Sequence, residues 1–116
     1  MYRDLNNKNI ILTGGSGFLG SQITRAFLKN NSNIYVLDIK KPTLKSKKLF
    51  YLKCDITNEN EVKKISKQLN KKKIDILINN AAKDYVPIKT QKKITFENFD
   101  LKKWNTDISV GLSGAF

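Results

Sequence analysis

The sequence has 116 residues, of which 40% are hydrophobic and 28% charged, which is the composition of one soluble globular domain. Cys54 is the single cysteine, so a disulfide framework within the chain is excluded. Histidine is absent and no group of Cys, Asp or Glu has the spacing of metal ligands, so we expect no metal site. The formal net charge of +12 raises the question of a nucleic-acid partner.

The basic residues do not form a pattern typical of nucleic-acid recognition. They are spread along the chain, and only two of the 22 are Arg, the residue preferred for bidentate contacts. A general bias toward Lys, Asn and Ile accounts for the charge, so we expect solvated surface and no specific nucleic acid. No apolar run approaches the roughly 18 residues of a membrane span, and the first nine residues lack a signal-like apolar segment. We therefore expect a cytoplasmic protein without a membrane partner, in which Cys54 is reduced and at least half-buried.

The first half of the chain alternates between strand and helix patterns. A short apolar run at Asn9–Thr13, ended by two glycines, predicts a buried strand. The spacing over 17–29 predicts a helix, because apolar residues recur at steps of three and four. These residues are Leu19, Ile23, Ala26 and Phe27. A second strand is predicted over 34–38, followed by a basic loop.

The second half continues the alternation. The patterns predict a third strand over 49–54 and a helix that starts at Asn58, where Glu61 three residues later resembles a capping pair. Val62, Ile65 and Leu69 would form its apolar stripe. A fourth strand follows over 74–79, then a polar loop over 83–95, and helical spacing returns over 96–116. This order favours an α/β fold with a parallel sheet and right-handed crossovers.

A glycine-rich loop connects the first strand to the first helix, from Thr13 to Gly20. A loop in this position is where a dinucleotide pyrophosphate binds, near the N–H groups of the helix start. Gly14 would allow the tight turn, Gly17 the close approach of backbone to phosphate, and Gly20 the close packing of helix on strand. The loop therefore predicts a dinucleotide site.

Asp38 ends the second strand, 24 positions after Gly14, close to the offset of about 20 expected for a carboxylate that binds the adenosine ribose hydroxyls. Its charge would repel a 2′-phosphate, which favours NAD over NADP. Lys40 and Lys41 keep NADP open as an alternative, because a basic pair just past the strand could reach that phosphate.

With these elements in place, the chain resembles the short-chain dehydrogenase/reductase family over nearly its whole length. Asp55 and Ile56 are similar to the family's adenine-binding pair, and 79–82 resembles its Asn-Asn-Ala-Gly segment, with Ala82 in place of the glycine. The stretch 104–116 is similar to the start of the family's long dimer-forming helix. The resemblance implies a Rossmann-type, doubly wound, three-layer α/β/α sheet with strand order 3-2-1-4. The residues expected to contact the cofactor are Gly14, Ser16, Gly17, Phe18, Leu19, Gly20, Asp38, Asp55, Ile56, Asn80, Ala81 and Ala82.

Two departures from the family bear on chemistry. The glycine spacing matches the extended branch of nucleotide-sugar epimerases and dehydratases, whereas 79–82 matches the single-domain oxidoreductases. Gly111 stands where many members have the asparagine of the catalytic tetrad.

Tyr85 and Lys89 have the spacing of the family's Tyr-x-x-x-Lys pair, but Pro87 between them disfavours the helix that this pair requires. No catalytic residue is therefore assigned in this chain.

These patterns predict an NAD(P)-dependent oxidoreductase of short-chain dehydrogenase/reductase type, which moves hydride between nicotinamide and a hydroxyl or carbonyl carbon. The alternatives are a nucleotide-sugar epimerase or dehydratase of the extended branch, and a non-catalytic dinucleotide-binding module. We expect residues 1–116 to be a truncated N-terminal portion of an NAD(P)-binding domain, inactive alone. The fourth strand and the last helix would otherwise expose apolar faces. The complete protein is expected to act on a small polar substrate, such as a sugar, and to form a homo-oligomer.

Overall fold

Four parallel strands form one sheet in the order β3-β2-β1-β4, which confirms the predicted α/β class and strand order. The computed structural model describes residues 2–83 and 95–116. Its main elements are β1 (Asn9–Thr13), α1 (Phe18–Lys29), β2 (Asn33–Asp38), β3 (Leu49–Lys53), α2 (Glu59–Leu69), β4 (Ile76–Ile78) and α3 (Leu101–Ile108). Short helical turns are η1 (Arg3–Leu5), η2 (Phe96–Asn98) and the π-helical η3 (Ser109–Ser113).

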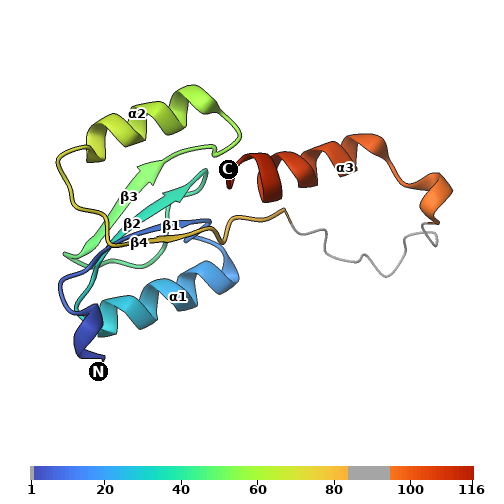
Figure 1. Cartoon of the computed structure of the whole chain (residues 1–116). Helices are drawn as coiled ribbons and strands as arrows, with labels where there is room; N and C mark the ends of the chain where they lie inside the picture. The colour runs from blue at the N-terminus through green and yellow to red at the C-terminus, as the bar shows by residue number, and fades with distance from the viewer. Residues whose placement is uncertain (1, 84–94) are drawn as a thin grey trace.

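The helices lie on both sides of the sheet, as Figure 1 shows: α1 covers one face and α2 the other, while α3 extends beyond the carboxyl ends of the strands. In this arrangement β1 and β2 are central and all four strands point the same way. The carboxyl ends of the strands therefore meet at one edge, beside the start of α1 and the end of the α3 segment.

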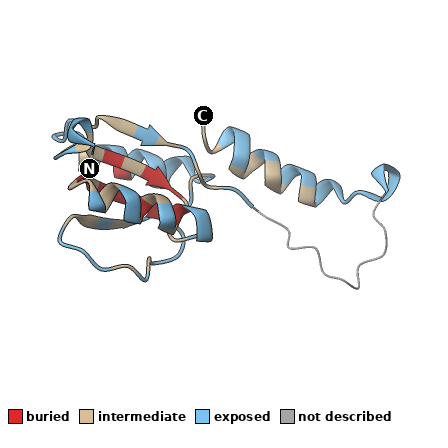
Figure 2. Ribbon diagram, turned by 90° about the horizontal axis from the view of Figure 1, so that it is seen from below, coloured by how far each residue is buried: buried red, intermediate tan, exposed pale blue. Residues whose placement is uncertain are grey.

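Two apolar clusters, one for each face of the sheet, hold the layers together. Alternate residues of β1 and β2, namely Ile10, Leu12, Ile34 and Val36, are fully buried and pack with α1. The opposite cluster contains Tyr35, Leu37, Cys54 and Ile65. Figure 2 shows the buried residues concentrated on the central strands. Cys54 is buried as predicted, and burial, followed by the nearby Glu61 and Asp55 carboxylates, raises the pKa of its thiol, which favours the unreactive protonated form.

The buried face of α1 differs from the predicted stripe. Ile23 and Phe27 pack against the core as expected, but Leu19 is 62% exposed and Ala26 is also exposed. Gly20 and Thr24 are buried instead. The reason is the close approach of α1 to the glycine loop at Gly20, which turns Gly20 and Thr24 toward the sheet and Leu19 toward the cleft.

Two apolar surfaces lack cover in the described ranges. β4 pairs with β1 and has no strand on its other side, and Leu77 is 58% exposed. On α3 and η3, Trp104 and Leu112 are 55% and 64% exposed. The sequence predicted that the fourth strand and the last helix would expose apolar faces, and these exposed side chains agree with that prediction. None of the helices in residues 2–83 and 95–116 is long and apolar enough to cross a bilayer.

Candidate functional site

A cleft of about 970 Å³ opens at the carboxyl ends of the strands, and all twelve predicted cofactor residues line it. The volume lies at the upper end of the range of about 300 to 1,000 Å³ for small-molecule sites. The glycine loop, the end of β2, the loop after β3 and the segment after β4 form its walls, because the strands are parallel and end at the same edge. The structure thus brings the predicted residues together, while their contact with a cofactor stays a prediction.

Gly14 and Gly20 are required by the backbone around them. Gly14 has φ +67°, and a Cβ there would lie 2.7 Å from Ala81 Cα. A Cβ on Gly20 would collide with the carbonyl oxygen of Gly14 and lie 2.7 Å from Gly15 Cα. These positions agree with the predicted roles in the turn and in the packing of helix on strand.

Gly17 is different, because its Cβ would meet only the Gly14 carbonyl oxygen, at an ordinary 3.4 Å. It is exposed, lines the cleft and is the N-cap of α1, and no side chain caps this helix end. The first N–H groups of a helix have no intrahelical partner, and together with the helix dipole they favour an anion. Gly17 is therefore open beside the start of α1, at a position that lines the cleft.

The Asp38 carboxylate connects the glycine loop to the end of β2. It accepts hydrogen bonds from the backbone N–H of Ser16 at 2.9 Å and of Lys40 at 2.9 Å. The Ser16 hydroxyl in turn donates to the Lys40 carbonyl oxygen at 2.6 Å. Each carboxylate oxygen has a second lone pair, so Asp38 can still accept from a ligand hydroxyl. Asp38 is thus placed both to shape the loop and to bind at the cleft.

Thr13 and Asn80 join β1 to the segment after β4. The buried Thr13 hydroxyl accepts from the N–H groups of Asn80 and Ala81, each at 3.1 Å. The Asn80 amide donates to the carbonyl oxygens of Thr13 and Gly14, also at 3.1 Å each. This network holds the glycine loop beside 80–82, and the sequence patterns did not identify Thr13 as part of it.

Thr13→Val is expected to lower the free energy of unfolding by about 2 kcal/mol, because two partly buried N–H groups lose their acceptor. The matched control is Thr24→Val, in which another buried threonine loses only a bond to the Gly20 carbonyl of its own helix. We expect the control to change stability by less than about 1 kcal/mol. Urea unfolding of both variants measures the difference, and equal effects would contradict the role of the Thr13 hydroxyl.

The loop after β3 is shaped by Asp55, whose carboxylate accepts from the N–H and the hydroxyl of Thr57 at 2.9 and 2.7 Å. These bonds hold the pKa of Asp55 below its ordinary value. Asn58 caps α2 as predicted, and its side-chain amide donates to Glu61 Oε1 at 3.3 Å. The other Glu61 oxygen accepts from the Asp55 N–H at 2.7 Å. The loop that carries Ile56 is therefore fixed on both sides.

Several cleft residues were missed by sequence reasoning. The segment after 100 was predicted as a helix from its apolar residues, yet its other side lines the cleft with Asn105, Thr106, Ser109 and Val110. The spacing of the polar residues Asn105, Thr106 and Ser109 is a weak signal, because solvent-exposed faces of helices have the same pattern. Lys40, which the sequence offered as a partner for a 2′-phosphate of NADP, also lines the cleft. The remaining lining residues are Leu37, Ile39, Cys54, Thr57 and Lys83.

Other sequence features fall outside the cleft or outside the described residues. Tyr85, Pro87 and Lys89 belong to 84–94, which lies outside the described residues. Gly111 is exposed within the π-helical η3, where a Cβ would meet no described atom within 4 Å. In the described ranges there is no group of three or more Cys, Asp or Glu that could hold a metal ion.

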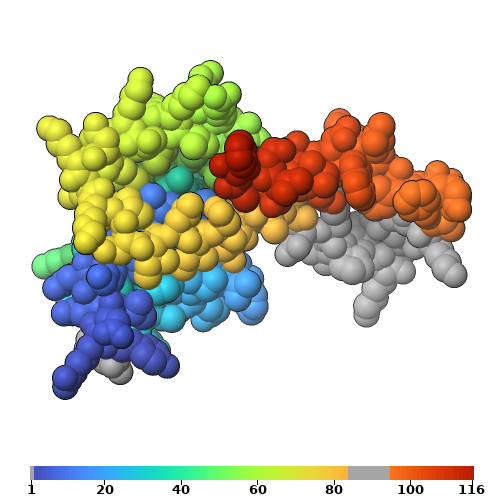
Figure 3. Space-filling model, viewed as in Figure 1, coloured from blue at the N-terminus to red at the C-terminus, as the bar shows by residue number. Residues whose placement is uncertain are grey.

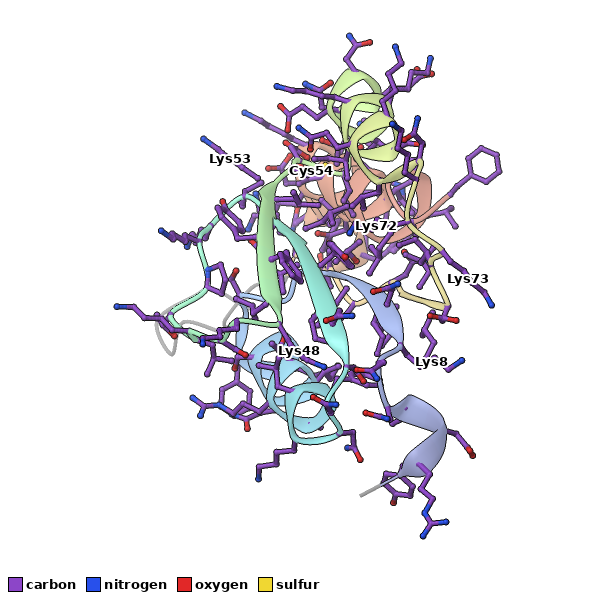
Figure 4. All side chains as sticks on the ribbon, turned by 90° about the vertical axis from the view of Figure 1, so that its left-hand side faces the viewer. Lys8, Lys48, Lys53, Cys54, Lys72 and Lys73 are labelled. Atoms are coloured by element: carbon purple, nitrogen blue, oxygen red, sulfur yellow. The ribbon has the colours of Figure 1, made fainter. Side chains whose placement is uncertain are left out.

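Figure 4 labels Lys8, Lys48 and Lys53, and the neighbouring pair Lys72 and Lys73. Two of them bind within the protein. Lys48 Nζ donates to Asn7 Oδ1 and to the Asn31 carbonyl, each at 2.9 Å, and Lys8 pairs with Asp75 at 3.4 Å. The Asn9 N–H and, less strongly, Lys8 hold the pKa of Asp75 below its ordinary value. Lys8 and Lys48 therefore have structural partners near the amino ends of β1 and β3, and neither lines the cleft.

The sequence model of the short chain dehydrogenase family matches residues 8–116. The chain belongs to the short-chain dehydrogenase family. Among curated family relatives, short-chain dehydrogenase reductase 3c of Arabidopsis thaliana is 30% identical over 121 aligned residues, which cover 96% of this chain and 44% of that protein. A short chain dehydrogenase/reductase of Gibberella zeae is 39% identical over 88 residues, covering 67% of this chain and 33% of that protein.

Solved structures of short-chain dehydrogenases have the same fold. The short chain dehydrogenase of Leptospira borgpetersenii with bound NAD+ matches with a TM-score of 0.78 and 29% identity, covering 96% of this chain and 42% of that one. The aldohexose dehydrogenase of Thermoplasma acidophilum, in ligand-free form, has a TM-score of 0.81 and 28% identity, covering 99% and 42%. The chain thus spans less than half the length of these four relatives.

Proposed function

We propose that this chain binds a nicotinamide dinucleotide, NAD in preference to NADP, as part of an oxidoreductase of the short-chain dehydrogenase family. The observation that carries the proposal is the convergence of an uncapped helix start, the open side of Gly17 and the Asp38 carboxylate on one cleft. The NAD+ bound to the Leptospira relative supports it. When bound, the nicotinamide would exchange hydride with a hydroxyl or carbonyl carbon of the substrate.

The residues present fit such a cofactor. The N–H groups at the start of α1 suit the pyrophosphate, and Asp38 suits the hydroxyls of the adenosine ribose. Asp55 and Ile56 would bind adenine, while 80–82 would lie along the second ribose. The pyrophosphate site would be lined by the other predicted residues of the glycine loop and the first turn of α1, which are Ser16, Phe18, Leu19 and Gly20.

The preference for NAD rests on charge. The carboxylate of Asp38 would repel a 2′-phosphate, although Lys40 also lines the cleft and favours NADP. The two N–H groups bound to Asp38 hold its carboxylate at the edge of the cleft, where it acts on either cofactor. We assign Asp38 a larger effect on cofactor preference than Lys40, because these bonds fix the position of the Asp38 carboxylate.

The remaining parts of the proposal concern the complete protein. A small polar substrate, such as a sugar, is supported by the similarity to an aldohexose dehydrogenase. The exposed apolar residues Trp104, Ile108 and Leu112 support a homo-oligomer. The single cysteine, Cys54, is buried and supports a reducing, cytoplasmic location, and the chain by itself would bind cofactor without turnover.

A non-catalytic dinucleotide-binding module is the second candidate. It is favoured by Gly111, which gives η3 no side chain at the position where the family's relay asparagine is expected. The two candidates differ in one measurement, because only the oxidoreductase would reduce NAD+ with a polyol or sugar when expressed from the complete gene. Lack of any turnover by a folded, NAD-binding complete protein would favour the module.

The test is a calorimetric titration of the purified chain with NAD+ and NADP+. We expect saturable NAD+ binding, weaker NADP+ binding, and about tenfold weaker NAD+ binding by Asp38→Ala, equivalent to about 1.4 kcal/mol. Asp4→Ala, which removes an exposed carboxylate in η1, is the control and should bind like the parent. Absence of binding by a chain shown to be folded by circular dichroism would overturn the proposal.

A further inference from the structure

The end of the α3–η3 segment meets the loop after β3 at Gly114 and Ile56. Gly114 follows η3 with helical backbone angles, φ −66° and ψ −38°. A Cβ on Gly114 would lie 2.9 Å from both Cδ1 and Cγ1 of Ile56 and 3.0 Å from the Ser109 carbonyl oxygen. Carbon atoms pack at about 3.5 to 4.0 Å, so a methyl group at 114 would require the Ile56 side chain or the end of the helix to move.

This contact bears on the cleft, because the same helical segment forms one of its walls. Figure 3 shows the α3–η3 segment projecting from the body of the molecule, with the end of the chain lying against that body. Asn105, Thr106, Ser109 and Val110 line the cleft from this projecting segment. The contact at Gly114 therefore lies at the end of the same helical segment that carries these lining residues.

Hydrogen bonds on both sides of Ile56 hold the loop that carries it. Asp55 and Thr57 are hydrogen-bonded to each other, and the Asp55 N–H donates to Glu61 of α2. Ile56 also lines the cleft, so a ligand seated there would pack against the same side chain that meets Gly114. A shift of the helix end and a change in the ligand site are thus linked through one residue.

We propose that Gly114 is a positioning residue: by lacking a Cβ it seats the α3–η3 segment on Ile56, and this seating holds the helical wall of the nucleotide cleft in place. The proposal rests on the proposed function for its ligand. Occupancy of the cleft near Ile56 and docking of the segment consequently stabilise each other.

The experiment compares Gly114→Ala with Gly111→Ala in the full 116-residue chain. Both substitutions add one methyl group near the same helix end and share the gain in helix propensity, but a Cβ at 111 meets no described atom within 4 Å. Amide hydrogen exchange over 101–113, read by mass spectrometry, reports docking without ligand. We expect exchange about tenfold faster in Gly114→Ala than in Gly111→Ala, and NAD+ binding about tenfold weaker.

Two further measurements separate positioning from general stability. NAD+ should slow exchange over 101–113 in Gly111→Ala but not in Gly114→Ala. Adding Ile56→Ala to Gly114→Ala removes the obstructing atoms and should restore slow exchange in the absence of ligand, while affinity stays low because Ile56 itself lines the cleft.

The outcomes distinguish this proposal from the proposed function. Equal exchange and equal NAD+ affinity in the two glycine variants would overturn the role of Gly114, even if the parent chain binds NAD+. If the parent chain does not bind NAD+, the proposed function fails, but the exchange measured without ligand still tests the role of Gly114. Faster exchange in Gly114→Ala than in Gly111→Ala, reversed by adding Ile56→Ala, would support that role. Equal exchange in the two glycine variants would overturn it.

Discussion

Gly17→Ala is expected to weaken NAD+ binding by at least about tenfold, or about 1.4 kcal/mol, while the chain stays folded. The added methyl group meets nothing closer than the Gly14 carbonyl oxygen at 3.4 Å, so the fold can accept it. It would, however, occupy the space beside the first N–H groups of α1, where the pyrophosphate is expected to approach. The cost to the fold should stay below about 1 kcal/mol, because only an N-cap glycine is replaced.

Calorimetry with NAD+ measures the loss, and thermal unfolding confirms that the variant is folded. Gly111→Ala is the control, since it adds the same methyl group to an exposed glycine that does not line the cleft. Unchanged affinity in Gly17→Ala would mean that the open side of this glycine does not receive the ligand, which would remove the main support for the glycine loop as the binding site.

Gly20→Ala is expected to have the largest effect on stability. Its Cβ would collide with backbone atoms of Gly14 and Gly15, and backbone cannot move aside as a side chain can. We expect the free energy of unfolding to fall by about 3 kcal/mol or more, a large part of the roughly 5 to 15 kcal/mol of a typical domain. The gain in helix propensity from glycine to alanine, about 1 kcal/mol, is too small to compensate.

Denaturant unfolding followed by circular dichroism tests this expectation, with Gly17→Ala as the matched control in the same loop. A marked loss of stability in Gly20→Ala, with little change in Gly17→Ala, would support the different roles of the two glycines. Similar stability of both variants would show that α1 can move away from β1, contrary to the close packing described above.

The twelve residues predicted for the cofactor site come from four separate stretches, and the structure gathers them at one cleft. The sequence was informative here because each stretch lies at or just after the carboxyl end of a strand, and parallel strands all end at the same edge. The same reasoning could not find Thr13 or the helical wall at Asn105 and Ser109. Threonine in a strand and polar residues on a helix are common, and nothing local marks their partners.

Local pattern alone determined the order of elements, the parallel sheet and the position of the glycine loop. Short apolar runs, helical spacing and glycine pairs act over a few residues, so they can be read along the chain. Only the tertiary structure decided that Thr13 binds 80–81, that Asp38 ties Ser16 to Lys40, that Leu19 faces outward, and that Gly114 rests on Ile56. These contacts join residues far apart in sequence, and their geometry depends on how closely the layers pack.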